Sequence, residues 1–168
     1  MRRLLASACL LALPLAFLAY DNEPDGFRGI RWGSELKELE GFHEMITDPG
    51  YVNTEYYIRE GDKMKIGGAK LSTIRYKFWQ ERLSGIRICT VGYENYLALL
   101  DACEARFGEA TRVEDLDTHI WDGKVTRITL TYESTSDKVS LAFDGVRFMK
   151  EMLKRRKIEA EEGAESDF

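Results

Sequence analysis

Few side chains of this sequence have the type and spacing that catalysis or metal binding requires. Its two histidines are His43 and His119, and neither has a second His or Cys at the close spacing that a metal site needs. The sequence has no Gly-x-Ser-x-Gly, and Gly67-Gly68 lacks the Lys and Ser or Thr that complete a phosphate-binding loop. We therefore expect no catalytic residue, no metal and no cofactor. An enzyme is the less favoured class.

The cysteines raise the question of a disulfide. Cys9 lies in the first apolar segment, Cys89 at the end of a predicted hairpin strand, and Cys103 on the apolar stripe of the helix predicted next. A Cys89–Cys103 bridge would tie that helix to the sheet, and an oxidising compartment would permit it. Against it, strand alternation turns Cys89 away from the face of Ile86 and Ile88. The sequence leaves this disulfide open.

One strand carries the candidate for partner contact. Arg75, Lys77 and Trp79 alternate with three apolar residues, which places them together on the polar face of the predicted strand. An exposed tryptophan flanked by cations is a plausible anchor for a binding partner. The alternative is that Trp79 packs beneath a neighbouring loop or the C-terminal helix.

Charge and the first twenty residues bear on location. The chain has 24 basic and 29 acidic residues, so a nucleic-acid binder with a dominant basic face is disfavoured. Arg2 and Arg3 precede an uncharged run from Leu4 to Ala19, the layout of a signal peptide over residues 1–19. That run is shorter than the roughly 20 residues of a membrane-spanning helix. We expect a periplasmic or secreted protein, with an uncleaved anchor as the alternative.

The remaining pattern predicts an α+β fold in a single domain over residues 20–160. It indicates an antiparallel sheet with helices on one face, arranged as two αβββ pseudo-repeats plus a C-terminal helix. The predicted elements are a short strand at 27–33, a helix at 34–40, a loop at 42–53, strands at 54–59, 74–79, 86–88, 118–121, 127–132 and 139–143, a helix capped by Asn95 and closed by Gly108, a helix at 146–160, and an acidic C-terminal tail at 161–168.

Short sequence motifs along the chain resemble those of a group of small secreted proteobacterial proteins of unknown function. The motifs are Phe27-Arg28-Gly29-Ile30 with Trp32-Gly33, Ile66-Gly67 with Ala69, Tyr76 with Phe78-Trp79-Gln80, Gly92 with Asn95, Leu97 and Leu100, Phe107-Gly108, and Trp121 with Gly123. The repeated αβββ order is also similar to β-lactamase-inhibitor-like folds and to those of small lipoproteins of outer-membrane assembly. That second resemblance implies a protein-binding module without catalytic activity.

These observations favour an exported, non-catalytic module that binds a protein or an envelope component. The alternative is a small enzyme or small-ligand carrier whose site lies between the sheet and the helices. We expect no nucleic-acid partner and no stable membrane span after signal cleavage.

Export predicts that the mature chain begins at Tyr20. The intact mass of protein isolated from the envelope fraction tests this, and the expected mass lacks residues 1–19. A species that retains Met1 to Ala19 would show instead that the segment is an anchor.

Overall fold

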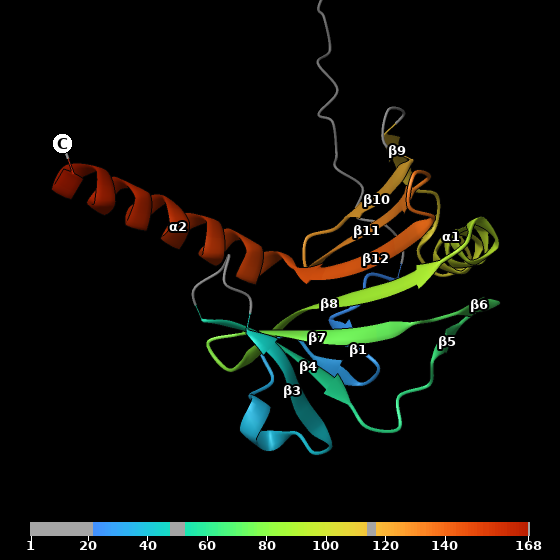
Figure 1. Cartoon of the computed structure of the whole chain (residues 1–168), viewed down its shortest axis with the longest axis horizontal. Coiled ribbons are helices and arrows are strands. Elements are labelled where there is room, and N and C mark those ends of the chain that lie inside the picture. Colours follow the sequence, from blue (N-terminus) through green and yellow to red (C-terminus); the bar gives the residue numbers. More distant parts are fainter. Residues whose placement is uncertain (1–21, 48–52, 114–116, 168) are drawn as a thin grey trace, which may run out of the picture.

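The computed structural model describes residues 22–47, 53–113 and 117–167, so the predicted signal peptide lies outside the described residues. An eight-stranded antiparallel sheet with the strand order β3-β4-β7-β8-β12-β11-β10-β9 forms the body (Figure 1). Its strands are β3 (Phe42–Thr47), β4 (Thr54–Arg59), β7 (Thr73–Trp79), β8 (Arg82–Val91), β9 (Thr111–Val113), β10 (Thr118–Asp122), β11 (Thr126–Glu133) and β12 (Lys138–Gly145). With its helices, this sheet confirms the α+β class.

Period-two alternation along the central strands gives the sheet one apolar face. Ile74, Ile88 and Leu141 lie opposite one another across β7, β8 and β12. The buried residues of this face are Ile74, Tyr76, Ile86, Ile88, Ile128, Leu130, Leu141 and Phe143. Successive side chains point to opposite faces, so the intervening positions send charged side chains to the other side. The hairpin predicted around residues 74–88 is confirmed.

Helix α1 (Tyr93–Phe107) covers part of the apolar face. It begins after Gly92, two residues before the predicted cap. The Asn95 side chain does not cap the helix, because it bonds backbone groups outside α1. The Asn95 amide donates to the Val91 carbonyl, and its oxygen accepts from the backbone N–H of Lys70. The predicted end at Gly108 is confirmed, and the Trp121 indole donates to the Gly108 carbonyl at 2.7 Å.

The N-terminal segment packs on the same apolar face. The strand predicted at 27–33 is a small hairpin of β1 (Gly26–Phe27) and β2 (Ile30–Arg31). The Phe27 ring centre lies 5.4 Å from that of Phe143. Arg28 pairs with Asp62 at 3.2 Å and donates to the backbone carbonyls of Lys63 and Lys65. Beyond Asp62, β5 (Lys65–Ile66) and β6 (Ala69–Lys70) form a second small hairpin.

The helix predicted at residues 34–40 is wrong, since only the three-residue 3-10 helix η1 (Leu36–Glu38) forms there. The backbone of this segment is bonded to the β7–β8 hairpin instead. The Leu83 N–H donates to Ser34, and the Leu36 N–H donates to Glu81. These bonds keep the backbone extended at Glu35, so a regular helix cannot run through this segment.

Two edge strands and the end of the last helix also differ from prediction. Strand β3 replaces the first half of the loop predicted at 42–53, and β9 was not predicted. Helix α2 (Val146–Asp167) continues seven residues past the predicted end at Ala160, through the acidic residues. Edge strands bury few side chains, so their hydrophobic pattern is weak.

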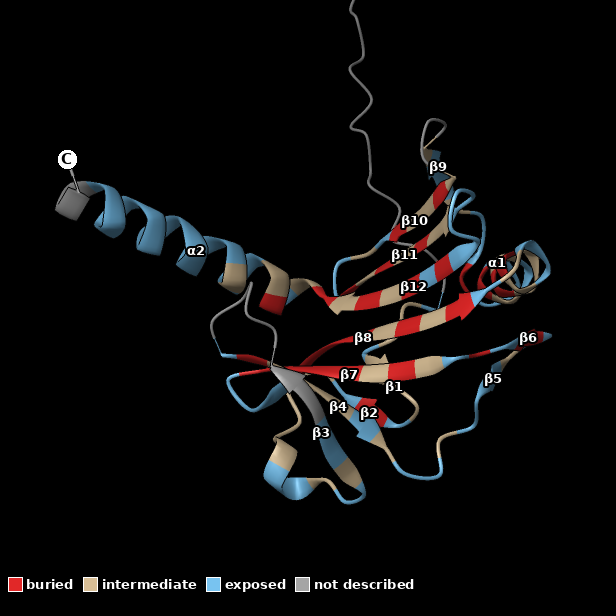
Figure 2. Ribbon diagram, viewed as in Figure 1, coloured by how far each residue is buried: buried red, intermediate tan, exposed pale blue. Residues whose placement is uncertain are grey.

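Helix α2 is held to the body at its first turns and then projects away from it (Figures 1 and 2). Phe148 is 3% exposed, and its ring makes a T-shaped contact with Trp79 at a centroid distance of 6.4 Å. Gly145 makes room for this anchor, because a Cβ there would come 3.1 Å from Phe148 and 3.3 Å from Trp32. No described helix is long and apolar enough to span a membrane.

The two helices lie on opposite sides of the sheet. The first turns of α2 face Lys77, Arg87 and Asp144, which alternate with the core residues that α1 covers. The prediction of helices on one face is therefore wrong. The alternating pattern marked the apolar face, but it could not show that the charged face would also acquire a cover.

We expect Phe148→Ala to lower the free energy of unfolding by about 3 kcal/mol, because it empties the packed site beneath α2. Urea unfolding followed by circular dichroism measures the loss. The matched control is Leu153→Ala, whose side chain is 61% exposed on the same helix and should cost under about 0.5 kcal/mol. Similar losses from both variants would contradict this anchor.

Candidate functional site

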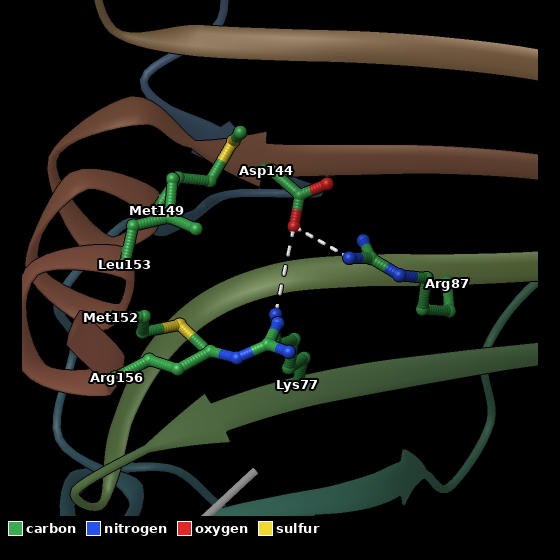
Figure 3. A pocket seen from close by; sticks show the side chains of 7 residues that line it. All are labelled: Lys77, Arg87, Asp144, Met149, Met152, Leu153 and Arg156. Carbon is green, nitrogen blue, oxygen red and sulfur yellow. Dashed lines mark hydrogen bonds and ion pairs between the residues drawn. The ribbon is translucent and has the colours of Figure 1, made fainter. Parts of the chain in front are cut away.

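A pocket of about 160 Å³ lies where α2 crosses the charged face of the sheet (Figure 3). Each of the three central strands β7, β8 and β12 contributes one charged residue, and α2 contributes an apolar wall and an arginine. The lining residues are Lys77, Arg87, Asp144, Met149, Met152, Leu153 and Arg156. We call this the α2 pocket.

Asp144 is the electrostatic centre of the α2 pocket. Its Oδ1 accepts a hydrogen bond from Arg87 Nη2 at 2.7 Å and lies 3.9 Å from Lys77 Nζ. The side chains of Lys77, Asp144 and Arg87 are 8%, 15% and 25% exposed. Charges removed from water to this degree need an opposite charge nearby, because their desolvation is costly. One carboxylate therefore stabilises two cations.

Gly85 permits this close approach of charges. It lies opposite Asp144 on the neighbouring strand. A Cβ at Gly85 would meet Asp144 Oδ1 at 2.9 Å, the Phe143 carbonyl oxygen at 2.8 Å and Arg87 Nη1 at 3.5 Å. Contacts below 3 Å are not tolerated by packed side chains without movement. A residue with no side chain is therefore required directly beneath the carboxylate.

The expectation that Trp79 is exposed is wrong, since the residue is 8% exposed and packs against Phe148 at the start of α2. The alternative, burial beneath the C-terminal helix, is what the structure shows. Lys77 is buried in the α2 pocket for the same reason. Arg75 lies further along β7, with its guanidinium 5.7 Å from the centre of the Tyr56 ring. Partner contact by these three residues stays a prediction.

Cys89 and Cys103 are free thiols, so the structure does not contain the disulfide that the sequence left open. Cys89 lies opposite Ser140 on β12, on the face away from α1, and its Sγ accepts from Arg75 at 3.4 Å. Cys103 is buried beneath α1, and burial raises the pKa of its thiol to about 12. The strand parity that argued against the bridge is confirmed.

The histidines do not join the α2 pocket. His43 lies exposed on edge strand β3, 3.7 Å from Glu60. His119 is half-buried beside the ring of Tyr96, and burial together with the positive charge of Arg112 lowers the pKa of its imidazole. Across residues 22–47, 53–113 and 117–167, no three His, Cys, Asp or Glu side chains gather in a way that could hold a metal ion.

Sequence reasoning found Lys77 but missed Arg87, Asp144 and Arg156. The signal was a charged residue between two apolar neighbours for Lys77 and Arg87, whereas Asp144 lies between Phe143 and Gly145 at the end of its strand. That pattern is equally typical of a solvated face. The charges come together because β8 pairs with β12, which places Asp144 opposite Gly85, a residue 59 positions earlier in the sequence.

Comparison with known proteins gives no relative for this chain. No family model, no curated protein sequence and no solved structure matches it. The resemblance based on short sequence motifs stays a prediction. Several residues of those motifs make contacts within the fold: the Trp32 indole donates to Thr126 Oγ1 at 2.6 Å, and Phe107 packs against Phe143.

Alkylation distinguishes Cys89 from Cys103. In the folded protein we expect iodoacetamide to modify the peptide with Cys89 and to leave Cys103 unmodified, because that thiol is buried and stays protonated. In denatured protein that has not been reduced, both should react. Peptide mass spectrometry reads the result, and a protected pair after denaturation would establish a disulfide that the structure lacks.

Proposed function

We propose that the protein is an exported, non-catalytic module that binds a protein or an envelope component, and that α2 is the contacting element. The observation that carries this proposal is the exposure of α2. The helix spans 22 residues, yet every residue from Leu153 to Ala164 is exposed (Figure 2). Most helical stability in proteins comes from packing of one face, and the outer turns of α2 have no such packing within the described chain.

The charge order of α2 supports a partner. Apart from Glu151, its basic residues come first, in the cluster Lys150, Lys154, Arg155, Arg156 and Lys157, and its other acidic residues follow from Glu159 onward. The helix dipole favours the reverse order, with acids near the N-terminus and bases near the C-terminus. Pairs such as Arg155–Glu159 at 3.1 Å are exposed and contribute little. A charge distribution that does not help the isolated helix is suited to intermolecular contact.

The pseudo-repeat belongs to the same proposal. Strands β3, β4, β7 and β8 run consecutively from one edge to the sheet centre, and β9 to β12 do so from the other edge. We infer that η1 with the first four strands and α1 with the second four are the two repeats, each with one strand more than predicted. The resemblance to protein-binding modules rests on an αβββ order with three strands in each unit, so units with four strands do not add support to it, and fold alone does not assign function.

Site-specific photo-crosslinking tests the proposal in cells that express the full chain. A photoreactive amino acid at Ile158, an exposed apolar position of α2, should give one discrete adduct in the envelope fraction. The matched control is the same amino acid at Ser136, exposed in the turn between β11 and β12, which should give none. Absence of an adduct at position 158, or the same adducts from both positions, would contradict α2 as the binding element.

A further inference from the structure

We propose that the outer turns of α2 bind the same turns of a second copy of this chain, with the two helices antiparallel. This inference rests on the proposed function, because it names the partner of the element that was assigned there. Three features of the molecule support it: the order of charges along one face of the helix, the complementarity of that face to itself, and a hollow beside it.

One face of the outer helix carries two blocks of charge around a single apolar residue. Residues three and four positions apart lie on the same side of a helix, so Lys154 and Arg155 share a face with Ile158, and so do Glu161 and Glu162. All five side chains are exposed, Ile158 to 43% (Figure 2). Along the helix this face therefore presents two cations, an isoleucine and two carboxylates.

This face is complementary to a copy of itself that runs in the opposite direction. A two-fold axis at Ile158 sets each residue opposite the one that lies equally far beyond Ile158 in the partner. Lys154 then faces the partner's Glu162, and Arg155 faces the partner's Glu161. The two isoleucines meet at the axis. A parallel pair of helices would instead bring like charges to the same level, which is destabilising.

The ion pairs within α2 leave these charges available to a second copy. Among the residues that the structure describes, neither Lys154 nor Glu162 forms an ion pair. Arg155 and Glu161 do so only with neighbours four residues away, at 3.1 and 3.7 Å, in exposed pairs that contribute little. A carboxylate can accept from more than one donor, so an intermolecular contact does not require these pairs to break.

A hollow of about 510 Å³ lies between this face of α2 and the turn that joins β7 to β8. Trp79 and Gln80 line it on the side of the turn, and Lys154, Ile158 and Glu162 are among the residues that line it on the helix. One turn of α-helix, about 5.4 Å long and about 10–12 Å across, occupies roughly 400–600 Å³. In the antiparallel pair the C-terminal part of the partner helix runs back along this face toward the body, where it would fill the hollow.

Sedimentation equilibrium of the purified protein measures the association, and reversed charges test the pairing. Lys154→Glu with Arg155→Glu makes the face acidic throughout, and Glu161→Lys with Glu162→Lys makes it basic throughout. Each double variant alone should self-associate at least about tenfold more weakly than the wild type, because like charges then meet. An equimolar mixture of the two should recover the wild-type association, because each acidic face meets a basic one.

The matched control is Lys70→Glu with Lys138→Glu, which changes the net charge equally at two exposed cations away from α2. This control should associate as the wild type does. The inference is wrong if the wild type stays monomeric up to about 1 mM, the limit of weak binding. It is also wrong if the mixture associates no better than either variant alone, or if the control weakens association as much as they do.

The photo-crosslink at Ile158 separates this inference from the proposed function. An adduct of twice the mass of the chain supports both. An adduct of any other mass, from a protein that sediments as a monomer, overturns the second copy as partner and leaves the proposed function standing. Absence of an adduct contradicts both.

Discussion

The two-residue alternation of the three central strands is the constraint on which this structure depends. It sends Tyr76, Ile86 and Phe143 into the core beneath α1 and the N-terminal hairpin. The same alternation necessarily sends Lys77 and Asp144 to the opposite face. Once β8 and β12 pair in register, the charged side chains of that face lie within contact distance. The site is thus a consequence of building the core.

Helix α2 turns this charged face from a solvated surface into an enclosed one. Phe148 packs against Trp79 and fixes where the helix leaves the sheet, and Gly145 allows the chain to enter that packing. From this anchor the next two turns carry Met152 and then Arg156 over the strands. One aromatic contact therefore positions both the apolar wall of the pocket and its outermost cation, while the rest of the helix extends away from the body (Figure 1).

Whether an element could be predicted from the sequence depends on how much apolar surface its residues bury. The hairpin at 74–88 and helix α1 were predictable, because each has one apolar face with a clear period. Strands β3 and β9 were not, because edge strands bury little. Helix η1 was overestimated, since backbone bonds to the β7–β8 hairpin hold Ser34 and Leu36 in place of a regular helix. Lys77 was found but expected on an exposed face, because the cover by α2 is a long-range contact that no local pattern contains.

The central claim is that Asp144 is the buried counter-charge for the face beneath α2. The most direct test is the free energy of unfolding of Asp144→Asn, which keeps the side-chain shape and removes the charge. We expect a loss of about 3 kcal/mol, because the enclosed guanidinium of Arg87 loses the carboxylate that it bonds, and Lys77 loses a nearby opposite charge. Asp122→Asn removes an exposed partner of Arg127 and should cost under about 1 kcal/mol. Equal losses from the two variants would contradict the account.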